Sequence, residues 1–338
     1  MHVLVTGATG FVGFHTVKAL LAAGHTVRFG VRNVEKMQRL YQPHNIDCSD
    51  YSKAPITNKK AVTQALEGCD AVVHTAAMVS MNAADSERML ETNLGGTQNV
   101  IEAALESGIE RIVHVSSVSV LSQKAGSPIT EETPYALPKS GYARSKIAAD
   151  KYVRSKQAEG AKIAVTYPTG IIGPDDPSLS EMMDALAYYL NNTHLITSSG
   201  QQCVDVRDIA DIHVKLLEAK ASGAYVLGGH FLSYPEQHAM LEVVTGKHVR
   251  TMRMPGGILR AMGGISDLLR KAIPYDTIFT AEAMYFATKF TPASNQKVER
   301  EFNFTFRPAE TSYRDSIRFL AATGKVKSGW ADNIISDT

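Results

Sequence analysis

A tyrosine followed four residues later by a lysine can carry acid and base chemistry, and this pattern occurs four times in the chain. The pairs are Tyr135 with Lys139, Tyr142 with Lys146, Tyr152 with Lys156 and Tyr285 with Lys289. In a helix such residues lie one turn apart, so the lysine cation can stabilise the phenolate that remains after the tyrosine gives up its proton. The same spacing is ordinary on a solvated helix face, so position has to decide between the pairs.

Position favours Tyr142. It begins a helical stretch, YARSKIAADKYVRSKQAEG, directly after a proline-containing loop. Tyr135 lies between two prolines, which exclude a regular helix there. Tyr152 is displaced by about 80° around the same helix at ~100° per residue, so it is expected on the helix surface. Tyr285 lies in a C-terminal region of irregular pattern.

Hydroxyl side chains follow a predicted strand in HVSSVSVLS, residues 114–122. They are Ser116, Ser117, Ser119 and Ser122. The carboxyl ends of strands in a doubly wound sheet form the edge that binds ligands. The serines are therefore either part of a site at that edge or an ordinary polar strand exit.

A glycine-rich stretch, TGATGFVG at residues 6–13, lies between a predicted strand and a predicted helix. Gly7 allows a tight turn, Gly10 allows the backbone to approach a pyrophosphate, and Gly13 allows the helix to pack closely on the sheet. The amino end of the helix then faces the anion. This context predicts a dinucleotide site.

The end of the second predicted strand reads GVRN and indicates which dinucleotide binds. A site that takes the 2′-hydroxyl form usually has an acidic residue here, whereas a 2′-phosphate calls for arginine. Arg32 and Asn33 supply a cation and a neutral donor. NADP(H) is therefore predicted as the cofactor, and NAD(H) is less favoured.

Short β-branched strands alternate with helices up to about residue 168, which predicts a Rossmann-type α/β fold with a doubly wound parallel sheet. A smaller, discontinuous mixed α/β substrate domain is predicted to complete it. The expected division is 1–170 plus 204–232 for the dinucleotide-binding domain and 171–203 plus 233–338 for the substrate domain. The helical segment EMMDALAYYLNN is expected over a pocket or in the core.

Composition excludes several classes of function. The formal net charge is +1, from 35 basic and 34 acidic side chains, so neither nucleic acid nor an anionic membrane surface is an expected partner. The three cysteines, Cys48, Cys69 and Cys203, lack metal-ligand spacing, and no metal is expected. No leader or long apolar run is apparent, so a cytoplasmic protein is expected.

Together these motifs resemble the extended short-chain dehydrogenases/reductases over about residues 1–215. The resemblance also includes HTAA at 74–77, the asparagine in ETNLGGTQNV, and PTGIIGP. It implies a catalytic set of Ser117, Tyr142 and Lys146, because the family's serine precedes its tyrosine by about 25 residues. Asn93 is implied as a structural or water-relay residue.

The resemblance also implies the cofactor contacts and a possible homodimer. The implied cofactor-binding residues are Gly7, Thr9, Gly10, Phe11, Val12, Gly13, Arg32, Thr75, Ala76, Ala77, Tyr142, Lys146, Pro168, Gly170 and Ile171. Pro55 stands where the family usually has an acidic residue that holds the adenine, and Asp47 or Asp50 is a candidate replacement. The dimer would form through the helices that carry Tyr142 and Asn93.

Within the family, VRFGVRN and YPTGIIGP look most like the dihydroflavonol reductase and ketone/aldehyde reductase branch. An NADP(H)-dependent carbonyl reductase or alcohol dehydrogenase is therefore expected, with a small-molecule substrate. Apolar candidates such as Met182, Met183, Leu186, Tyr189 and the MRMP segment favour an apolar substrate. An NAD-dependent nucleotide-sugar epimerase and a non-catalytic dinucleotide sensor remain alternatives. A dehydratase is disfavoured because Val118 and Ser119 replace the carboxylic acids that elimination needs.

Overall fold

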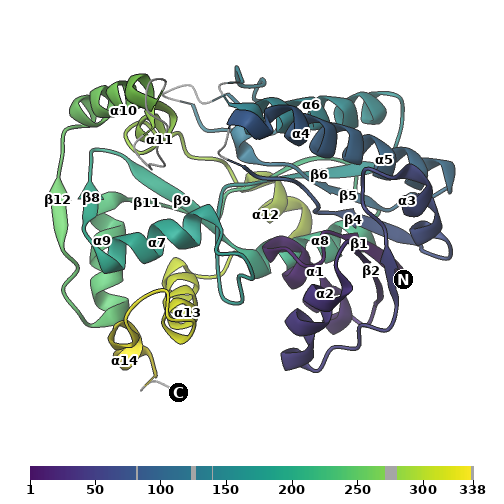
Figure 1. Ribbon diagram of the computed structural model, residues 1–338, viewed down its shortest axis with the longest axis horizontal. Coiled ribbons are helices and arrows are strands. Elements are labelled where there is room, and N and C mark those ends of the chain that lie inside the picture. The colour runs from purple at the N-terminus through teal and green to yellow at the C-terminus, as the bar shows by residue number, and fades with distance from the viewer. Residues whose placement is uncertain (81–82, 123–126, 139, 271–279, 336–338) are drawn as a thin grey trace.

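A seven-stranded parallel sheet forms the larger part of the molecule (Figure 1). The computed structural model describes residues 1–80, 83–122, 127–138, 140–270 and 280–335. The strand order is β10-β6-β5-β4-β1-β2-β3. The bounds are β1 His2–Thr6, β2 Thr26–Val31, β3 Tyr51–Lys53, β4 Ala71–His74, β5 Ile112–Val115, β6 Ile163–Pro168 and β10 Gly223–Leu227. The order turns back at β1 and β4, so the predicted doubly wound Rossmann-type sheet is confirmed.

Helices cover both faces of this sheet (Figure 1). One face carries α1 (Phe11–Ala22), α2 (Val34–Tyr41) and α8 (Val206–Glu218), and the other carries α3 (Lys59–Leu66), α4 (Ser86–Leu90), α5 (Gly96–Glu106) and α6 (Gly141–Ala158). Successive strand residues point to opposite faces: Val3 and Val5 join the α1 side of the core, whereas Leu4 joins the α5 side. Burial on both faces explains why the strands are apolar throughout.

The smaller part contains two short sheets and most of the C-terminal helices. One sheet joins β7 (Gly170–Ile172), β9 (Gly200–Asp205) and β11 (His230–Ser233), and the other pairs β8 (His194–Ile196) with β12 (Thr251–Arg253). The helices are α7 (Glu181–Asn191), α9 (Tyr234–Thr245), α10 (Gly256–Arg270), α11 (Ala281–Phe286), α12 (Gln296–Phe302), α13 (Ala309–Ala322) and α14 (Asp332–Ile335). The domain boundaries given above stay a prediction. Within the described ranges, no helix is both long enough and apolar enough to cross a membrane.

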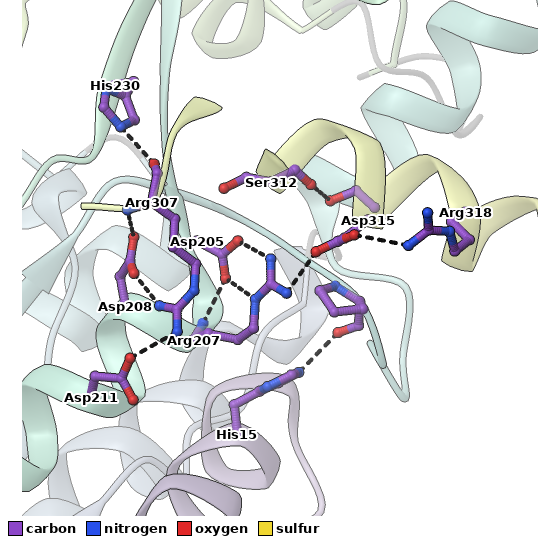
Figure 2. A network of polar contacts seen from close by, with 12 residues as sticks. His15, Asp205, Arg207, Asp208, Asp211, His230, Arg307, Ser312, Asp315 and Arg318 are labelled. Atoms are coloured by element: carbon purple, nitrogen blue, oxygen red, sulfur yellow. Dashed lines mark hydrogen bonds and ion pairs between the residues drawn. The ribbon is translucent and has the colours of Figure 1, made fainter. Parts of the chain in front are cut away.

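An ion-pair network joins the two parts (Figure 2). Asp205 is fully buried at the end of β9 and begins α8 as its capping residue. Arg207 contacts both of its carboxylate oxygens, with Nε 2.9 Å from Oδ1 and Nη2 2.7 Å from Oδ2. The other Arg207 nitrogen donates to Asp315 of α13 at 2.6 Å. Burial alone would raise the pKa of Asp205, but Arg207 holds it below its ordinary value. A single guanidinium therefore connects α8 to α13.

A second arginine strengthens the same junction. The Arg307 side chain pairs with Asp208 and reaches Asp211 at 3.0 Å, and its backbone N–H donates to Asp208 at 2.9 Å. His230 of β11 hydrogen-bonds the Arg307 carbonyl at 2.7 Å. Burial raises the pKa of Asp208 to about 6, although Arg307 opposes the shift. The segment before α13 is thereby fixed against α8.

Removing Arg207 is expected to destabilise the whole fold. In Arg207→Met, buried Asp205 keeps the hydrogen bond from the backbone N–H of residue 207 but loses the guanidinium that compensates its charge, which should cost about 3 kcal/mol in the free energy of unfolding. Arg314→Met is the matched control, because Arg314 pairs with Glu310 on the exposed side of α13 and its loss should change stability by less than about 0.5 kcal/mol. Urea unfolding followed by circular dichroism measures both. Equal losses in the two variants would contradict a structural role of the network.

Candidate active site

The turn after β1 and the start of α1 leave no room for side chains. Gly7 has a φ of +73°, and a Cβ there would lie 2.7 Å from the backbone of Ala76. A Cβ on Gly13 would overlap the Gly7 carbonyl and lie 2.8 Å from the Thr75 hydroxyl. Thr75 in turn donates to the Thr6 carbonyl at 2.8 Å, which ties the end of β4 to the end of β1. Four predicted cofactor residues, Gly7, Gly13, Thr75 and Ala76, are thus brought together.

The amino end of α1 is suited to hold an anion. Gly10 precedes the helix and has no side chain that could cap it, and Phe11, Val12 and Gly13 form the first turn. Their backbone N–H groups have no partner within the helix, and the helix dipole adds positive potential at this end. Tyr41 at the end of α2 holds the turn between β1 and α1, because its hydroxyl donates to the Ala8 carbonyl at 2.6 Å. The cradle and the uncapped helix end together fit a pyrophosphate, so these residues would hold a dinucleotide.

The end of β2 presents cations to this edge of the sheet. Arg32 directly follows the strand and is exposed. Lys53, also exposed, ends the neighbouring strand β3, where it pairs with Val31 in the sheet register, so the two cations lie at the same edge. The Asn33 side chain accepts a hydrogen bond from Lys36 N at 2.8 Å and so caps α2. Arg32 therefore remains available to a ligand, whereas the carbonyl of Asn33 is occupied by the cap.

The proposed adenine contacts lie elsewhere. Asp50 pairs with Arg28 at 2.8 Å and with His2 at 3.2 Å, just before β3 begins. Asp47 accepts from Ser49 in the same loop. Both carboxylates thus stand at the amino ends of the strands, opposite the ligand edge, so the prediction that either replaces the usual acidic residue is wrong. The insertion before β3 places both carboxylates there. Pro55, which stands at the position of the usual acidic residue, has no carboxylate of its own.

The loop after β6 carries the predicted cofactor residues Pro168, Gly170 and Ile171. Pro168 ends β6, and Thr169 anchors the loop by donating to the Gly228 carbonyl at 2.8 Å. Gly170 starts β7 and lies against Met182 of α7, because a Cβ on Gly170 would come within 3.0 Å of the Met182 sulfur. Ile171 packs beside the same apolar clusters as Val12 of α1. The loop is thereby fixed between α1 and α7.

Tyr142 lies in the first turn of α6, and neighbouring contacts fix its position. Ser140 caps the helix by accepting from Ala143 N at 3.2 Å. Gly141 packs so closely on Ser86 of α4 that a larger residue would not fit. Burial, followed by the negative charge of Glu181 in α7, raises the pKa of Tyr142 to about 12. At neutral pH the phenol therefore keeps its proton.

Lys146 lies one turn further along α6 and is only 6% exposed. Its ammonium group donates to the Val115 carbonyl at 3.0 Å, at the end of β5. Burial lowers the pKa of Lys146 to about 8, and the negative charge of Asp150 partly offsets this effect. The lysine is thus charged at neutral pH and close to the point of losing its proton.

Asp150 extends this arrangement by one more helical turn. It is fully buried, and its Oδ2 accepts hydrogen bonds from the hydroxyls of Tyr135 at 2.8 Å and Tyr167 at 3.0 Å. Burial raises the pKa of Asp150, and the hydroxyls of Ser116, Tyr135 and Tyr167 and the charge of Lys146 oppose that shift. The site therefore has a buried carboxylate that supports the charged form of Lys146.

Ser117 and Ser119 stand together at the exit of β5. Ser117 has an extended backbone and caps a short 3-10 turn at Val118–Val120. Its hydroxyl oxygen accepts from Ser119 N at 3.2 Å and from the Ser119 hydroxyl at 3.0 Å. Because its oxygen accepts both bonds, the Ser117 hydroxyl hydrogen is available to a substrate oxygen.

Asn93 is a positioning residue. It is 2% exposed and lies in a π-helical turn, Glu91–Gly95, between α4 and α5. Its side-chain oxygen accepts from Met78 N at 2.7 Å, and its amide nitrogen donates to the Met78 carbonyl at 3.0 Å and to the Ser145 hydroxyl at 2.9 Å. Ser145 in turn donates to the Tyr142 carbonyl at 2.8 Å. Asn93 therefore links the loop after β4 to the helix that carries the tyrosine.

Residues 3–228 match the NAD dependent epimerase/dehydratase family. The chain belongs to this family. Its similarity to reductases places it in the dihydroflavonol reductase-like branch of the extended short-chain dehydrogenases/reductases. The 4-hydroxy-2-methyl-3-oxo-4-farnesyl-3,4-dihydroquinoline-1-oxide ketoreductase of Stigmatella aurantiaca is 32% identical over 341 residues, covering 96% of this chain and 98% of that protein. Cinnamoyl-CoA reductase 1 of Petunia hybrida is 31% identical over 240 residues, or 66% of this chain and 71% of that protein.

Solved structures share the fold over nearly the whole chain. The crystal structure of gox2253 has a TM-score of 0.81 and 26% sequence identity, and the match covers 96% of this chain and 99% of that one. The UDP-glucose-4-epimerase of Stenotrophomonas maltophila, with bound NAD and formylated UDP-arabinopyranose, has a TM-score of 0.77 at 19% identity, with coverage of 96% and 99%. The epimerase likeness shows the fold alone.

The other tyrosine and lysine pairs in this family member have structural contacts. Tyr135 donates to Asp150, and Lys139 lies outside the described residues. Tyr152, expected on the helix surface, instead donates to Glu102 of α5 at 2.9 Å and so helps to join α6 to α5. Tyr285 lies in the short helix α11 rather than in an irregular segment.

Sequence reasoning missed several residues that shape the site. Two of them shift the pKa values of the candidate catalytic pair: Asp150 raises that of Lys146 and Glu181 raises that of Tyr142. The other two are tyrosines that hold neighbouring groups by hydrogen bonds: Tyr167 donates to Asp150, and Tyr41 donates to the carbonyl of Ala8. Only Asp150 had a readable signal, because it lies four residues after Lys146 on one helix face. In the helix EMMDALAYYLNN, Met183 and Leu186 are buried in the core, as the core alternative expects, and Met182 lies against Gly170. Its place over a pocket stays a prediction. In the described part of the chain, no cluster of His, Cys, Asp and Glu could hold a metal ion.

Proposed function

We propose that this protein is an NADP(H)-dependent oxidoreductase that interconverts a carbonyl group and an alcohol. The arrangement of Tyr142 and Lys146 carries the proposal. Burial pushes the pKa of the phenol up to about 12 and that of the lysine down to about 8. An acid that holds its proton thus lies one helical turn from a cation that stabilises the resulting phenolate, at the edge of the sheet where the dinucleotide cradle opens.

Reduction of the carbonyl group to an alcohol requires one hydride at the carbon and one proton at the oxygen. A nicotinamide held by these residues would supply the hydride that the carbonyl carbon receives. The Tyr142 hydroxyl gives its proton to the carbonyl oxygen, and the product is the alcohol. Ser117 donates a hydrogen bond to the same oxygen as negative charge develops, which is worth about 3 kcal/mol for a well-placed donor. Lys146 stabilises the phenolate until solvent returns the proton.

The cofactor preference rests on Arg32. It is exposed directly after β2, with Lys53 next to it in the register and without an acidic residue at the end of the strand. A carboxylate here would accept the 2′-hydroxyl of NAD(H), whereas a guanidinium pairs with the 2′-phosphate of NADP(H). We therefore assign NADP(H) as the preferred form.

The substrate that fits best is an apolar ketone or aldehyde. The farnesyl-bearing ketone named for the S. aurantiaca ketoreductase is such a molecule, and that relative aligns over nearly the whole chain. Met182 lies next to Gly170, a predicted cofactor residue, and its flexible apolar side chain could contact an apolar substrate. We also propose a homodimer through α6 and the helices next to Asn93, and a cytoplasmic location.

A nucleotide-sugar epimerase is the second candidate. Its fold is the same, as the S. maltophila epimerase with bound NAD illustrates. An epimerase would retain NAD tightly and would gain nothing from Arg32. Purified protein that carries bound NAD would therefore favour this candidate over the reductase.

Tyr142→Phe is expected to abolish reduction. Without the phenol proton, the rate of NADPH oxidation with a panel of apolar ketones and aldehydes should fall at least about 100-fold. NADPH affinity should change little, since the ring remains. Tyr152→Phe is the matched control on the same helix, and it should keep the wild-type rate. Comparable losses in both variants would remove Tyr142 from the chemistry.

Arg32→Glu is expected to reverse the cofactor preference. A carboxylate at this position repels the 2′-phosphate, so the NADPH dissociation constant should rise at least about tenfold while NADH binding improves. Arg39→Glu introduces the same charge change on α2, away from the strand end, and should leave the preference unchanged. Fluorescence titration with both cofactors measures this. Unaltered NADPH affinity in Arg32→Glu would remove Arg32 from the site.

The reduction rate is expected to fall as pH rises through about 8. Above that value Lys146 loses its proton, and the phenolate loses the cation that stabilises it, while Tyr142 stays protonated up to about pH 12. In Asp150→Asn the charged form of Lys146 loses support, so the midpoint should move to lower pH. The measurement is kcat at saturating NADPH between about pH 6 and about pH 10. A flat profile, or a midpoint that moves upward in Asp150→Asn, would contradict this role.

A further inference from the structure

A cavity of about 330 Å³ lies in the smaller part of the molecule. Its walls come from the end of α7, from the segment between α9 and β12, and from the 3-10 turn Ser328–Ala331 before α14. Figure 1 shows these elements together on the side of the smaller part that faces away from α6. Leu190 in the wall lies about 12 Å further along α7 than Met182, at ~1.5 Å per residue. The cavity is therefore separate from the predicted cofactor residues near Gly170.

The lining of this cavity contains four basic residues and no acidic residue. The basic residues are Lys247, His248, Arg250 and Lys327. Two of them pair with carboxylates outside the lining: the Lys247 ammonium lies 3.0 Å from Asp332, and Nδ1 of His248 lies 2.7 Å from Glu242. Arg250 and Lys327 are exposed, and within the described ranges neither pairs with a carboxylate. The cavity therefore keeps positive charge that attracts an anion.

An indole forms another part of the lining. Trp330 is partly buried and packs against the apolar cluster of the smaller part. Its backbone N–H donates to the Lys327 carbonyl at 3.0 Å, so one short turn carries both the ring and a cation. Gly329 in the same turn leaves room for the Lys247 ammonium, because a Cβ there would lie only 3.0 Å from it. A ring held in this way offers a flat surface on which a planar ligand can stack.

Two asparagines at the end of α7 add hydrogen-bond acceptors to the same lining. The Asn191 amide nitrogen donates to the Lys325 carbonyl at 2.8 Å, and that of Asn192 donates to the Tyr188 carbonyl at 3.1 Å. The nitrogens are thus occupied by the protein, and the side-chain oxygens are left to accept hydrogen bonds from a ligand. A bare inorganic anion would gain nothing from such acceptors. The lining therefore favours a ligand that combines an anionic group with a planar ring and with hydroxyl or amino groups.

We propose that this cavity is a second ligand site, which binds a nucleoside monophosphate. The phosphate contacts Arg250 and Lys327, the base stacks on Trp330, and the ribose hydroxyls donate to the asparagine oxygens. The volume lies at the lower end of the range of ~300 to ~1,000 Å³ that is usual for small-molecule sites, so the cavity holds one nucleotide unit and not a dinucleotide. The binding does not require the proposed reductase chemistry, because the cavity shares no residue with the candidate active site.

The fluorescence of Trp330 tests the binding directly, because it is the only tryptophan of the chain. The full-length protein is titrated at constant ionic strength with adenosine 5′-monophosphate, with adenosine and with inorganic phosphate. The monophosphate is expected to change the indole emission with a saturable dependence on concentration. Its dissociation constant should lie at least about tenfold below those of adenosine and of phosphate, because only the monophosphate uses the ring and the cations together.

The double variant Arg250→Gln/Lys327→Gln removes the two unpaired charges. Its dissociation constant for the monophosphate should rise at least about tenfold, since two charge-assisted contacts are lost. Lys325→Gln is the matched control, because Lys325 is an exposed lysine of the same segment that does not line the cavity, and it should keep the wild-type affinity. All three substituted side chains are exposed, and circular dichroism verifies that the variants fold.

Several outcomes would overturn the proposal. An indole emission that does not respond to the monophosphate would do so, as would equal affinity for inorganic phosphate or for adenosine, or wild-type affinity in the double variant. A repeat of the titration with saturating NADP⁺ separates the cavity from the dinucleotide cradle at α1. A response to the monophosphate that NADP⁺ abolishes would place the nucleotide in the cradle and refute a second site. Protein that binds the monophosphate but no NADP⁺ would keep the second site and refute the proposed function.

Discussion

The backbone of α1 approaches the turn after β1 so closely that only glycine fits at the contact. Gly13 lies on the Gly7 carbonyl, and Thr75 from β4 closes the third side. This packing sets the direction of α1 and places its uncapped amino end at the edge of the sheet. The predicted cofactor residues on α1, on the strand ends and on the loop after β6 are arranged around that turn.

The chemistry of the site arises from burial acting on two groups of opposite charge. An acid and a base removed from water both favour their neutral forms, so the phenol of Tyr142 becomes a weaker acid and the ammonium of Lys146 a stronger one. Asp150 limits the second effect, and its own charge is stabilised by two tyrosine hydroxyls. The pKa values of this candidate catalytic pair are therefore shifted by residues that lie behind it in the core.

The fold could be predicted from local patterns, and so could the residues that the structure brings together in the candidate site. Alternating strands and helices predicted the sheet, and Tyr142 stood out because it begins a helix after a loop. Contacts across long sequence separations could not be predicted. The pairing of Asp50 with Arg28 depends on where an insertion folds. The side of α10 that faces the protein depends on the contacts of Arg260 with Thr288 and of Asp267 with Ala281. Periodicity identifies the apolar side of a helix without showing which side faces the core.

The junction around Arg207 also has a consequence for the order of events during synthesis. Asp315 lies 108 residues after Arg207, so that ion pair forms only when nearly the whole chain has left the ribosome. The strands of the large sheet are complete by Leu227, whereas α13 arrives later. The large sheet can therefore assemble first and bind Asp205 to Arg207 locally. The contact of Asp315 in α13, which joins the smaller part to α8, can form only after that, because α13 is synthesised later.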